Sequence, residues 1–235
     1  MSSLIFYTDK DQALVATDTL ATTPNGEPAF FTTKAFAVPH LQMIMASTGF
    51  SGFLGKWFVE VNDRMVVRGI DSLDYHAPIV LASLWNKFCE ENSIPNNRTS
   101  TVYHFGFSEE DGLIRTYVYR SGKNFSSEIL EYGLGVKPEC KIPEGAITTD
   151  VIKKMMEEQI SIQESQPKDK RVYIGGKIQI HHLTKTSCSI STLDQFDDFE
   201  AVEQRIFVNY DLGKKDSYQK HEAYKKTRAN TARTG

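Results

Sequence analysis

The chain has 235 residues, of which 40% are hydrophobic and 24% charged, and its formal net charge is −3. This is enough apolar material for one domain, or at most two small ones. A net charge near zero creates no overall field that attracts nucleic acid, so we expect no nucleic-acid partner. No apolar run approaches the ~18 residues of a membrane helix, and the start lacks the pattern of a signal peptide. We therefore expect a cytoplasmic protein without a membrane partner.

The sequence contains no pattern that is typical of a cofactor or metal site. Walker A, dinucleotide-binding and zinc-ligand patterns are all absent. The three cysteines Cys89, Cys140 and Cys188 are an odd number without metal-like spacing, which indicates reduced thiols. The adjacent His181 and His182 would point to opposite faces of a strand and could not bind one metal together. We expect no cofactor and no metal.

The first elements along the chain are predicted to be strands. Leu4–Thr8 and Ala13–Thr17 flank a polar turn and predict a hairpin. Phe30–Val38 and Gln42–Ser47 predict a second pair of strands, broken at Pro39.

Two helices are predicted next. Ser51–Met65 carries apolar residues at helical spacing. A second helix is predicted from about Tyr75 to Asn92, with N-caps offered by Ser72 to Asp74. The side chains that we expect to face inward from it are Ile79, Leu81, Leu84, Trp85 and Phe88.

The pattern then returns to strands, with one more helix among them. Strands are predicted at Thr101–Phe107, Ile114–Tyr119, Lys177–Leu183 and Ser187–Ile190, and a helix from about Thr148 to Gln166. Strands and helices that occur in groups favour antiparallel sheets covered by helices over a doubly wound parallel sheet. Two sheets between helical layers would satisfy this order, although periodicity alone does not select that solution.

The end of the chain differs in charge from the rest. Seven Lys or Arg and two acidic residues lie between Gly213 and Gly235, without apolar periodicity. We therefore predict a domain at residues 1–212 and a flexible basic tail at residues 213–235. A solvated tail and a docking arm for an acidic partner both fit this composition.

Four short segments carry a family resemblance. LVATDTLAT ends at Thr22, TKAFAV contains Lys34, MASTG ends at Gly49, and YIGGKIQIHHL ends at Leu183. These segments resemble the β subunits of the proteasome and HslV, which have the N-terminal-nucleophile (Ntn) hydrolase fold. The resemblance covers roughly Ser2 to Leu183. It implies an α+β fold, a four-layer αββα sandwich of two antiparallel sheets.

The resemblance also implies catalytic residues. With Asp18 and Lys34 placed on the family's aspartate and lysine, its N-terminal threonine falls on Ser2 without a gap. Removal of Met1 would make the Ser2 hydroxyl the nucleophile and the Ser2 α-amine the base, whose ordinary pKa of about 8 suits this role. Lys34 and Asp18 would tune the hydroxyl, and the backbone N–H of Gly49 would stabilise the oxyanion.

Each of these residues also has a structural interpretation. Asp18 could form a turn through its side chain. Lys34 could be a solvated strand residue, and Gly49 could supply a positive φ before a helix. Ser2 could be disordered, as second residues usually are.

Two functions remain open at this point. The first is hydrolysis of an amide or peptide bond by an N-terminal serine. The second is a catalytically inactive, proteasome-like structural subunit, which fits the presence of Arg171 and Ile174 where the family has an acid and a serine. In either case we expect a homo-oligomer, for which a ring is one arrangement. Trp57 and Phe58 are adjacent, so one of them is expected to contact a partner or a second packing layer, with a broad core face as the alternative.

Overall fold

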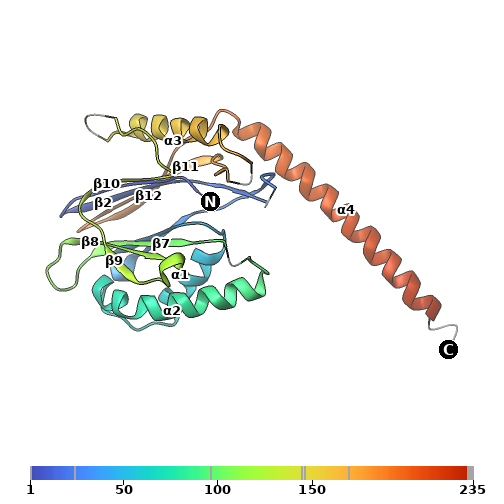
Figure 1. Cartoon of the computed structure of the whole chain (residues 1–235), viewed down its shortest axis with the longest axis horizontal. Helices are drawn as coiled ribbons and strands as arrows, with labels where there is room; N and C mark the ends of the chain where they lie inside the picture. The colour runs from blue at the N-terminus through green and yellow to red at the C-terminus, as the bar shows by residue number, and fades with distance from the viewer. Residues whose placement is uncertain are drawn as a thin grey trace.

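The computed structural model describes residues 2–231 except positions 24, 96, 144, 146 and 169, with side chains through residue 220 apart from 217 and 218. Figure 1 shows four stacked layers: a helix, two sheets that face each other, and a pair of helices. The predicted αββα sandwich of antiparallel sheets is confirmed.

The first sheet contains the first two strands of the chain in its interior. Its strand order is β10-β1-β2-β11-β12, and every neighbouring pair is antiparallel. The strands are β1 (Leu4–Thr8), β2 (Gln12–Asp18), β10 (Gly133–Lys137), β11 (Lys177–Thr184) and β12 (Cys188–Gln195). A short hairpin, β3 (Leu20–Thr22) and β4 (Pro28–Phe31), follows β2.

The second sheet is also antiparallel, in the order β5-β6-β7-β8-β9. Its strands are β5 (Ala35–Val38), β6 (Met43–Thr48), β7 (Thr101–Phe107), β8 (Ile114–Arg120) and β9 (Ser127–Ile129). Two short 3-10 turns, η1 (Pro39–Leu41) and η2 (Ser121–Lys123), precede β6 and β9.

Alternation along the strands produces the layers. In β1, Leu4 and Phe6 pack into the core between the two sheets, whereas Ile5 packs beneath α3 (Thr149–Glu164). A third core joins the second sheet to α1 (Phe53–Asp63) and α2 (Ile70–Glu91). Each sheet is therefore apolar on both faces, which is what a strand buried on both sides requires.

The predicted strand over Phe30–Val38 is wrong, because the chain changes sheets within it. β4 pairs with β3, whereas β5 pairs with β6 in the second sheet. The connection between β4 and β5 contains Lys34, which is 7% exposed. This break in the strand is what places Lys34 in the connection that leads from the β3–β4 hairpin to the second sheet.

The predicted inward face of α2 needs two corrections. Ile79 is 77% exposed, so it does not belong to the core. The helix also begins at Ile70 rather than near Tyr75, and its first N–H groups are capped from outside by Glu109 instead of by Ser72 to Asp74. The cap comes from a distant loop, which local pattern cannot reveal.

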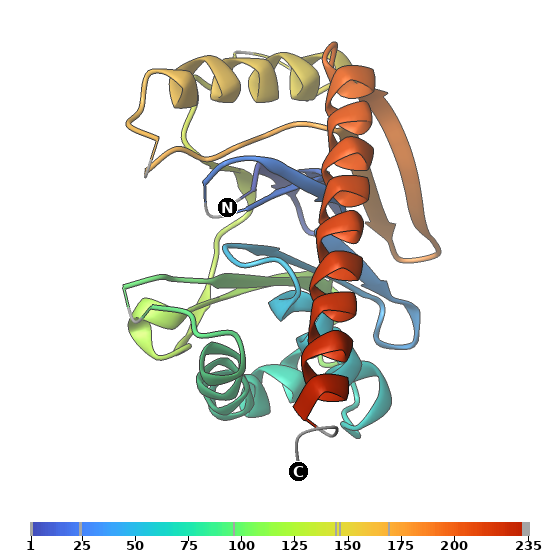
Figure 2. The same ribbon diagram turned by 90° about the vertical axis from the view of Figure 1, so that its right-hand side faces the viewer.

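A long helix, α4 (Phe199–Thr231), extends away from the four layers (Figure 1). Its first turn packs on the β3–β4 hairpin, where the rings of Phe199 and Phe31 stack with centroids 5.0 Å apart. In Figure 2 the helix passes in front of the layers. The helix continues through Gly213, so no break in secondary structure marks the predicted tail boundary; flexibility of residues 213–235 stays a prediction. Among the described helices, none combines the length and apolar character needed to cross a membrane.

Candidate active site

A buried ion pair joins two of the residues singled out in the sequence. The Lys34 Nζ atom donates hydrogen bonds to the Asp18 Oδ1 atom at 2.8 Å and to the backbone oxygen of Leu20 at 2.7 Å. Asp18, at the end of β2, is fully buried. The solvated alternative for Lys34 is therefore wrong.

Asp18 also fixes the first residues of the chain. Its Oδ1 atom accepts a hydrogen bond from the backbone N–H of Ser3 at 2.9 Å, and its Oδ2 atom accepts one from the N–H of Gly175 at 3.2 Å. The Ser3 hydroxyl in turn donates to the Gln159 Oε1 atom of α3 at 2.5 Å. These contacts hold Ser2 just before β1, near the ion pair, where it is only 7% exposed.

Burial lowers the pKa of the Lys34 ammonium below its ordinary value, and the Asp18 carboxylate opposes this shift. The opposing effect has a clear geometric source, because the two charged atoms are in hydrogen-bond contact. Lys34 is therefore held in the cavity wall with Ser2, and two acceptors fix the position of its Nζ atom.

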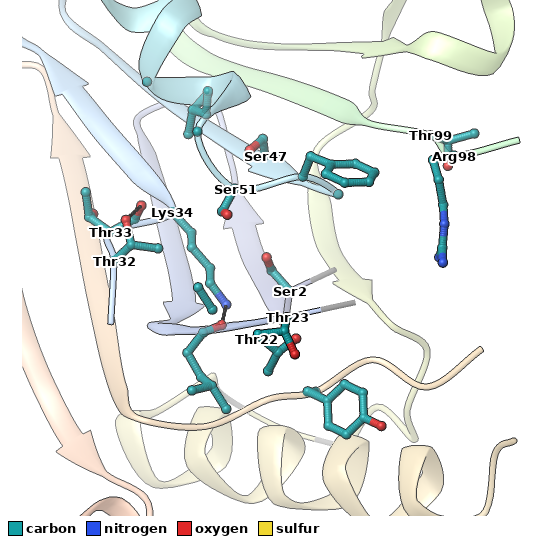
Figure 3. A pocket seen from close by; sticks show the side chains of 18 of the residues that line it. Ser2, Thr22, Thr23, Thr32, Thr33, Lys34, Ser47, Ser51, Arg98 and Thr99 are labelled. Carbon is teal, nitrogen blue, oxygen red and sulfur yellow. Dashed lines mark hydrogen bonds between the residues drawn. The ribbon is translucent and has the colours of Figure 1, made fainter. Parts of the chain in front are cut away.

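Ser2 and Lys34 open into one cavity of about 370 Å³. Figure 3 shows their side chains directed toward the same space, with Thr32 and Thr33 on one side and Arg98 on the other. The cavity lies at the end of the two sheets where β1, β6 and the β4–β5 connection meet. Its size is in the range of pockets that bind small ligands.

Gly49 lies in the wall of this cavity, directly after β6. Its φ of +125° is one that residues with a Cβ atom rarely adopt, and a Cβ atom there would come within 2.7 Å of the backbone oxygen of Thr99. The backbone conformation and the close approach of Thr99 therefore both require glycine at position 49. Gly49 also lies in the cavity wall, where a backbone N–H that binds an oxyanion would have to be.

Sequence reasoning missed several residues that complete the site. Ser3 and Gln159 anchor the chain start, and the backbone oxygen of Gly175 accepts from Thr19 and Leu20. Arg171, noted in the sequence only as a departure from a family pattern, lines the cavity together with Tyr173. Of these residues, only Gly175 was part of a recognisable sequence pattern, the Gly-Gly pair before β11. The other contacts join elements that are far apart in sequence, so local pattern could not predict them.

No group of three His, Cys, Asp or Glu side chains in the described part of the chain is arranged to hold a metal ion.

Comparison with known proteins identifies the architecture. No protein-family model matches the chain. No curated protein is similar to it in sequence. Among solved structures, it is similar to Anbu (ancestral beta-subunit) from Yersinia bercovieri, with 10% identity and a TM-score of 0.57 over 93% of this chain and 96% of that one. The fold is the proteasome-like Ntn fold.

Two further structures agree with this assignment. Anbu from Hyphomicrobium sp. strain MC1 has 13% identity and a TM-score of 0.54, and its Gly-1 mutant has 12% identity and a TM-score of 0.56. Each match covers 93% of this chain and 97% of the other. At these identities the likeness concerns the fold alone.

The structural similarity also corrects the predicted resemblance. The sequence segments pointed to the β subunits of the proteasome and HslV, and this is wrong, because the solved structures from Yersinia and Hyphomicrobium that the chain matches are Anbu proteins. The structural similarity supports an Ntn-like fold and no particular family within it.

Proposed function

We propose that the chain is an Ntn hydrolase that cleaves amide bonds with Ser2, after removal of Met1 has exposed its α-amine. The observation that supports this most is the buried Lys34–Asp18 pair beside Ser2 in the cavity wall. A buried ion pair costs free energy of desolvation that a purely structural position could avoid with apolar residues. Its location next to a candidate nucleophile supports a catalytic role for the pair.

The reaction would proceed in two stages. The Ser2 Oγ atom attacks the amide carbon and its proton passes to the α-amine, which then protonates the leaving nitrogen as the C–N bond breaks. Water next attacks the resulting ester, releasing a carboxylic acid and restoring the Ser2 hydroxyl. The Lys34 charge favours the neutral form of the amine and the developing negative charge on Oγ. The Gly49 backbone would bind the oxyanion.

A catalytically inactive, proteasome-like structural subunit is the second candidate. One observation favours it: among the described residues that line the cavity, no acidic side chain is present to orient the α-amine. Asp18 already accepts from three donors. In this case the ion pair would serve only to fix the start of the chain.

A peptide-cleavage assay that compares wild-type protein with Ser2→Ala distinguishes the hydrolase from the inactive structural subunit. We expect wild-type protein to cleave peptide amides and Ser2→Ala to lose this activity by about 10³-fold or more, because the nucleophile and its base act as a unit. Ser126→Ala, an exposed serine before β9, is the matched control and should keep full activity. The intact mass of protein from its native host should show that Met1 is absent. Retained Met1 together with no difference between the two variants would support the structural subunit.

A further inference from the structure

The described charged side chains that line the cavity all have the same sign. Lys34, Arg98, Lys168 and Arg171 line it, and no Asp or Glu does so among the described lining residues. The whole chain has 30 acidic and 27 basic residues, so composition does not account for this asymmetry. The four cations come from three separate connections: β4–β5, α2–β7 and α3–β11. The fold has brought them together.

Within the described part of the chain, three of these cations have no carboxylate partner. Of the ion pairs between described residues, Lys34 takes part in one, but none includes Arg98, Lys168 or Arg171. Arg171 uses one terminal nitrogen on the backbone oxygens of Glu164 and Gln166, which fix its direction but carry no net charge. Its buried Nε atom has no hydrogen-bond partner in the described structure.

The neutral part of the lining suits an anion as well. Hydroxyl groups that can donate hydrogen bonds also line the cavity, and they belong to Thr22, Thr23, Ser47, Ser51 and Thr99. The Thr32 and Thr33 hydroxyls instead donate to the backbone oxygens of Thr33 and Ala35. The ring of Tyr173 lies 6.0 Å from the Arg171 guanidinium and supports one side of it. A carboxylate entering this space would meet donors and positive charge.

We propose that the cavity selects an acidic peptide, in which an aspartyl or glutamyl residue supplies the acyl group of the cleaved amide. This rests on the proposed function, which places that acyl group on Ser2. The carboxylate of the residue would then lie among Arg98, Lys168 and Arg171. Nucleic acid is also anionic, but its backbone is bound along basic grooves of several nucleotides. These cations instead surround a cavity of about 370 Å³ next to a serine.

Binding can be measured without turnover by using the Ser2→Ala protein. Fluorescent hexapeptides that differ only in having glutamate, glutamine or lysine at the two central positions are the probes, with anisotropy as the readout. We expect the glutamate peptide to bind about tenfold or more tightly than the glutamine peptide, because hydrogen bonds to charged groups are the stronger ones. Equal binding of these two peptides, or tighter binding of the lysine peptide, would overturn the proposal. Tighter binding of a labelled hexanucleotide would overturn it too.

Variants locate the binding to the cavity. Arg98→Gln and Arg171→Gln, each combined with Ser2→Ala, should weaken the glutamate peptide several-fold and leave the glutamine peptide unchanged. Arg98 is exposed, so Arg98→Gln should fold normally. It therefore still tests the proposal if Arg171→Gln fails to fold. Arg68, an exposed arginine between α1 and α2, is the matched control, and Arg68→Gln should change neither affinity. An equal loss with Arg68→Gln would show a general charge effect and overturn the assignment.

A turnover assay separates this inference from the proposed function. Wild-type protein is given aminocoumarin amides that carry glutamate or glutamine before the cleaved bond. Selective cleavage of the glutamate amide supports both proposals. Equal cleavage of both amides would support the hydrolase proposal and contradict the proposed preference for an acidic residue. Selective binding of the glutamate peptide with no cleavage of either amide keeps the anion site and removes the hydrolase.

Discussion

At the scale of single residues, the Asp18–Lys34 pair determines how the site can be altered. Both charges are removed from water, so each depends on the other to offset its desolvation. Asp18→Asn should therefore lower the free energy of unfolding by about 3–5 kcal/mol, since it leaves a buried ammonium without its carboxylate. Chemical denaturation measures this loss directly.

A double variant tests the physical reason. Asp18→Asn combined with Lys34→Met removes both charges and should be clearly more stable than Asp18→Asn alone. The exposed pairs of Asp11 with Lys10 and Lys185 serve as the control, because Asp11→Asn should cost less than about 1 kcal/mol. If the double variant is as unstable as Asp18→Asn alone, Asp18 stabilises the fold only through the hydrogen bonds that it accepts from backbone N–H groups.

His104 shows a second effect at this scale, a dependence of stability on pH. Its ring is fully buried in β7, where the Trp57 Nε1 atom donates to its Nε2 atom at 2.8 Å. Burial lowers the pKa of His104 from 6.5 to about 3. Between pH 6.5 and about 3, the His104 ring is therefore protonated in the unfolded chain and neutral in the folded chain. The contribution of this residue to stability is lost progressively as pH falls below 6.5.

We expect the free energy of unfolding to fall by about 2 kcal/mol between pH 7.5 and pH 5 because of His104 alone. Burial also lowers the pKa of His181, with an opposing contribution from a backbone hydrogen bond at Ala35, so the total loss should be larger. His104→Gln keeps an acceptor for Trp57 but does not titrate. Denaturation at both pH values should show a smaller change for this variant, and an unchanged pH dependence would contradict the argument.

At the scale of elements, the start of α2 depends on a side chain from another layer. Both carboxylate oxygens of Glu109, in the β7–β8 turn, accept hydrogen bonds from the N–H groups of Asp71 and Ser72 at 3.0 and 2.6 Å. Glu109→Ala leaves these helix donors without their cap and should cost about 1 kcal/mol of stability. The neighbouring exposed Glu110 provides the control, because Glu110→Ala should have almost no effect in the same unfolding experiment.

Local pattern predicted the elements whose partners are close in sequence. The hairpin of β1 and β2, the pair β7 and β8, and the helices α1 and α3 all lie where periodicity placed them. It missed β9 and β10, two short strands that exist only because they pair with β8 and β1. It also joined β4 and β5, since an extended backbone looks the same in either sheet.

The same limit applies to the site. Ser2, Asp18, Lys34 and Gly49 were all named from short segments, and the structure places Ser2, Lys34 and Gly49 around one cavity, with Asp18 behind Lys34. Their catalytic roles stay a prediction. Arg98 and Lys168 were not singled out in the sequence, and Arg171 was noted only as a departure from a family pattern, because a basic residue in a loop has no characteristic spacing. Only the folded structure shows that the connections carrying these residues line the same cavity.

At the scale of the whole molecule, α4 is the feature that a single copy does not explain. The helix has 33 residues, and its only ion pair to the four layers among the described residues joins Arg205 to Glu27. Four large apolar side chains beyond it are more than half exposed: Phe207, Val208, Tyr210 and Leu212. A helix gains most of its stability in water by burying an apolar face, so these side chains favour contact with another copy.

We therefore predict a homo-oligomer, with contacts that involve α4 and the helical layers. Light scattering at micromolar concentration should give a mass that is a multiple of 26.6 kDa. Phe207→Ser with Tyr210→Ser should weaken assembly by about tenfold or more, since buried aromatic side chains dominate the affinity of interfaces. Val66→Ser, which changes a fully exposed apolar residue in the α1–α2 connection, should leave assembly unchanged. A monomeric wild-type protein would leave the apolar side chains of α4 for a different partner and would remove the subunit function altogether.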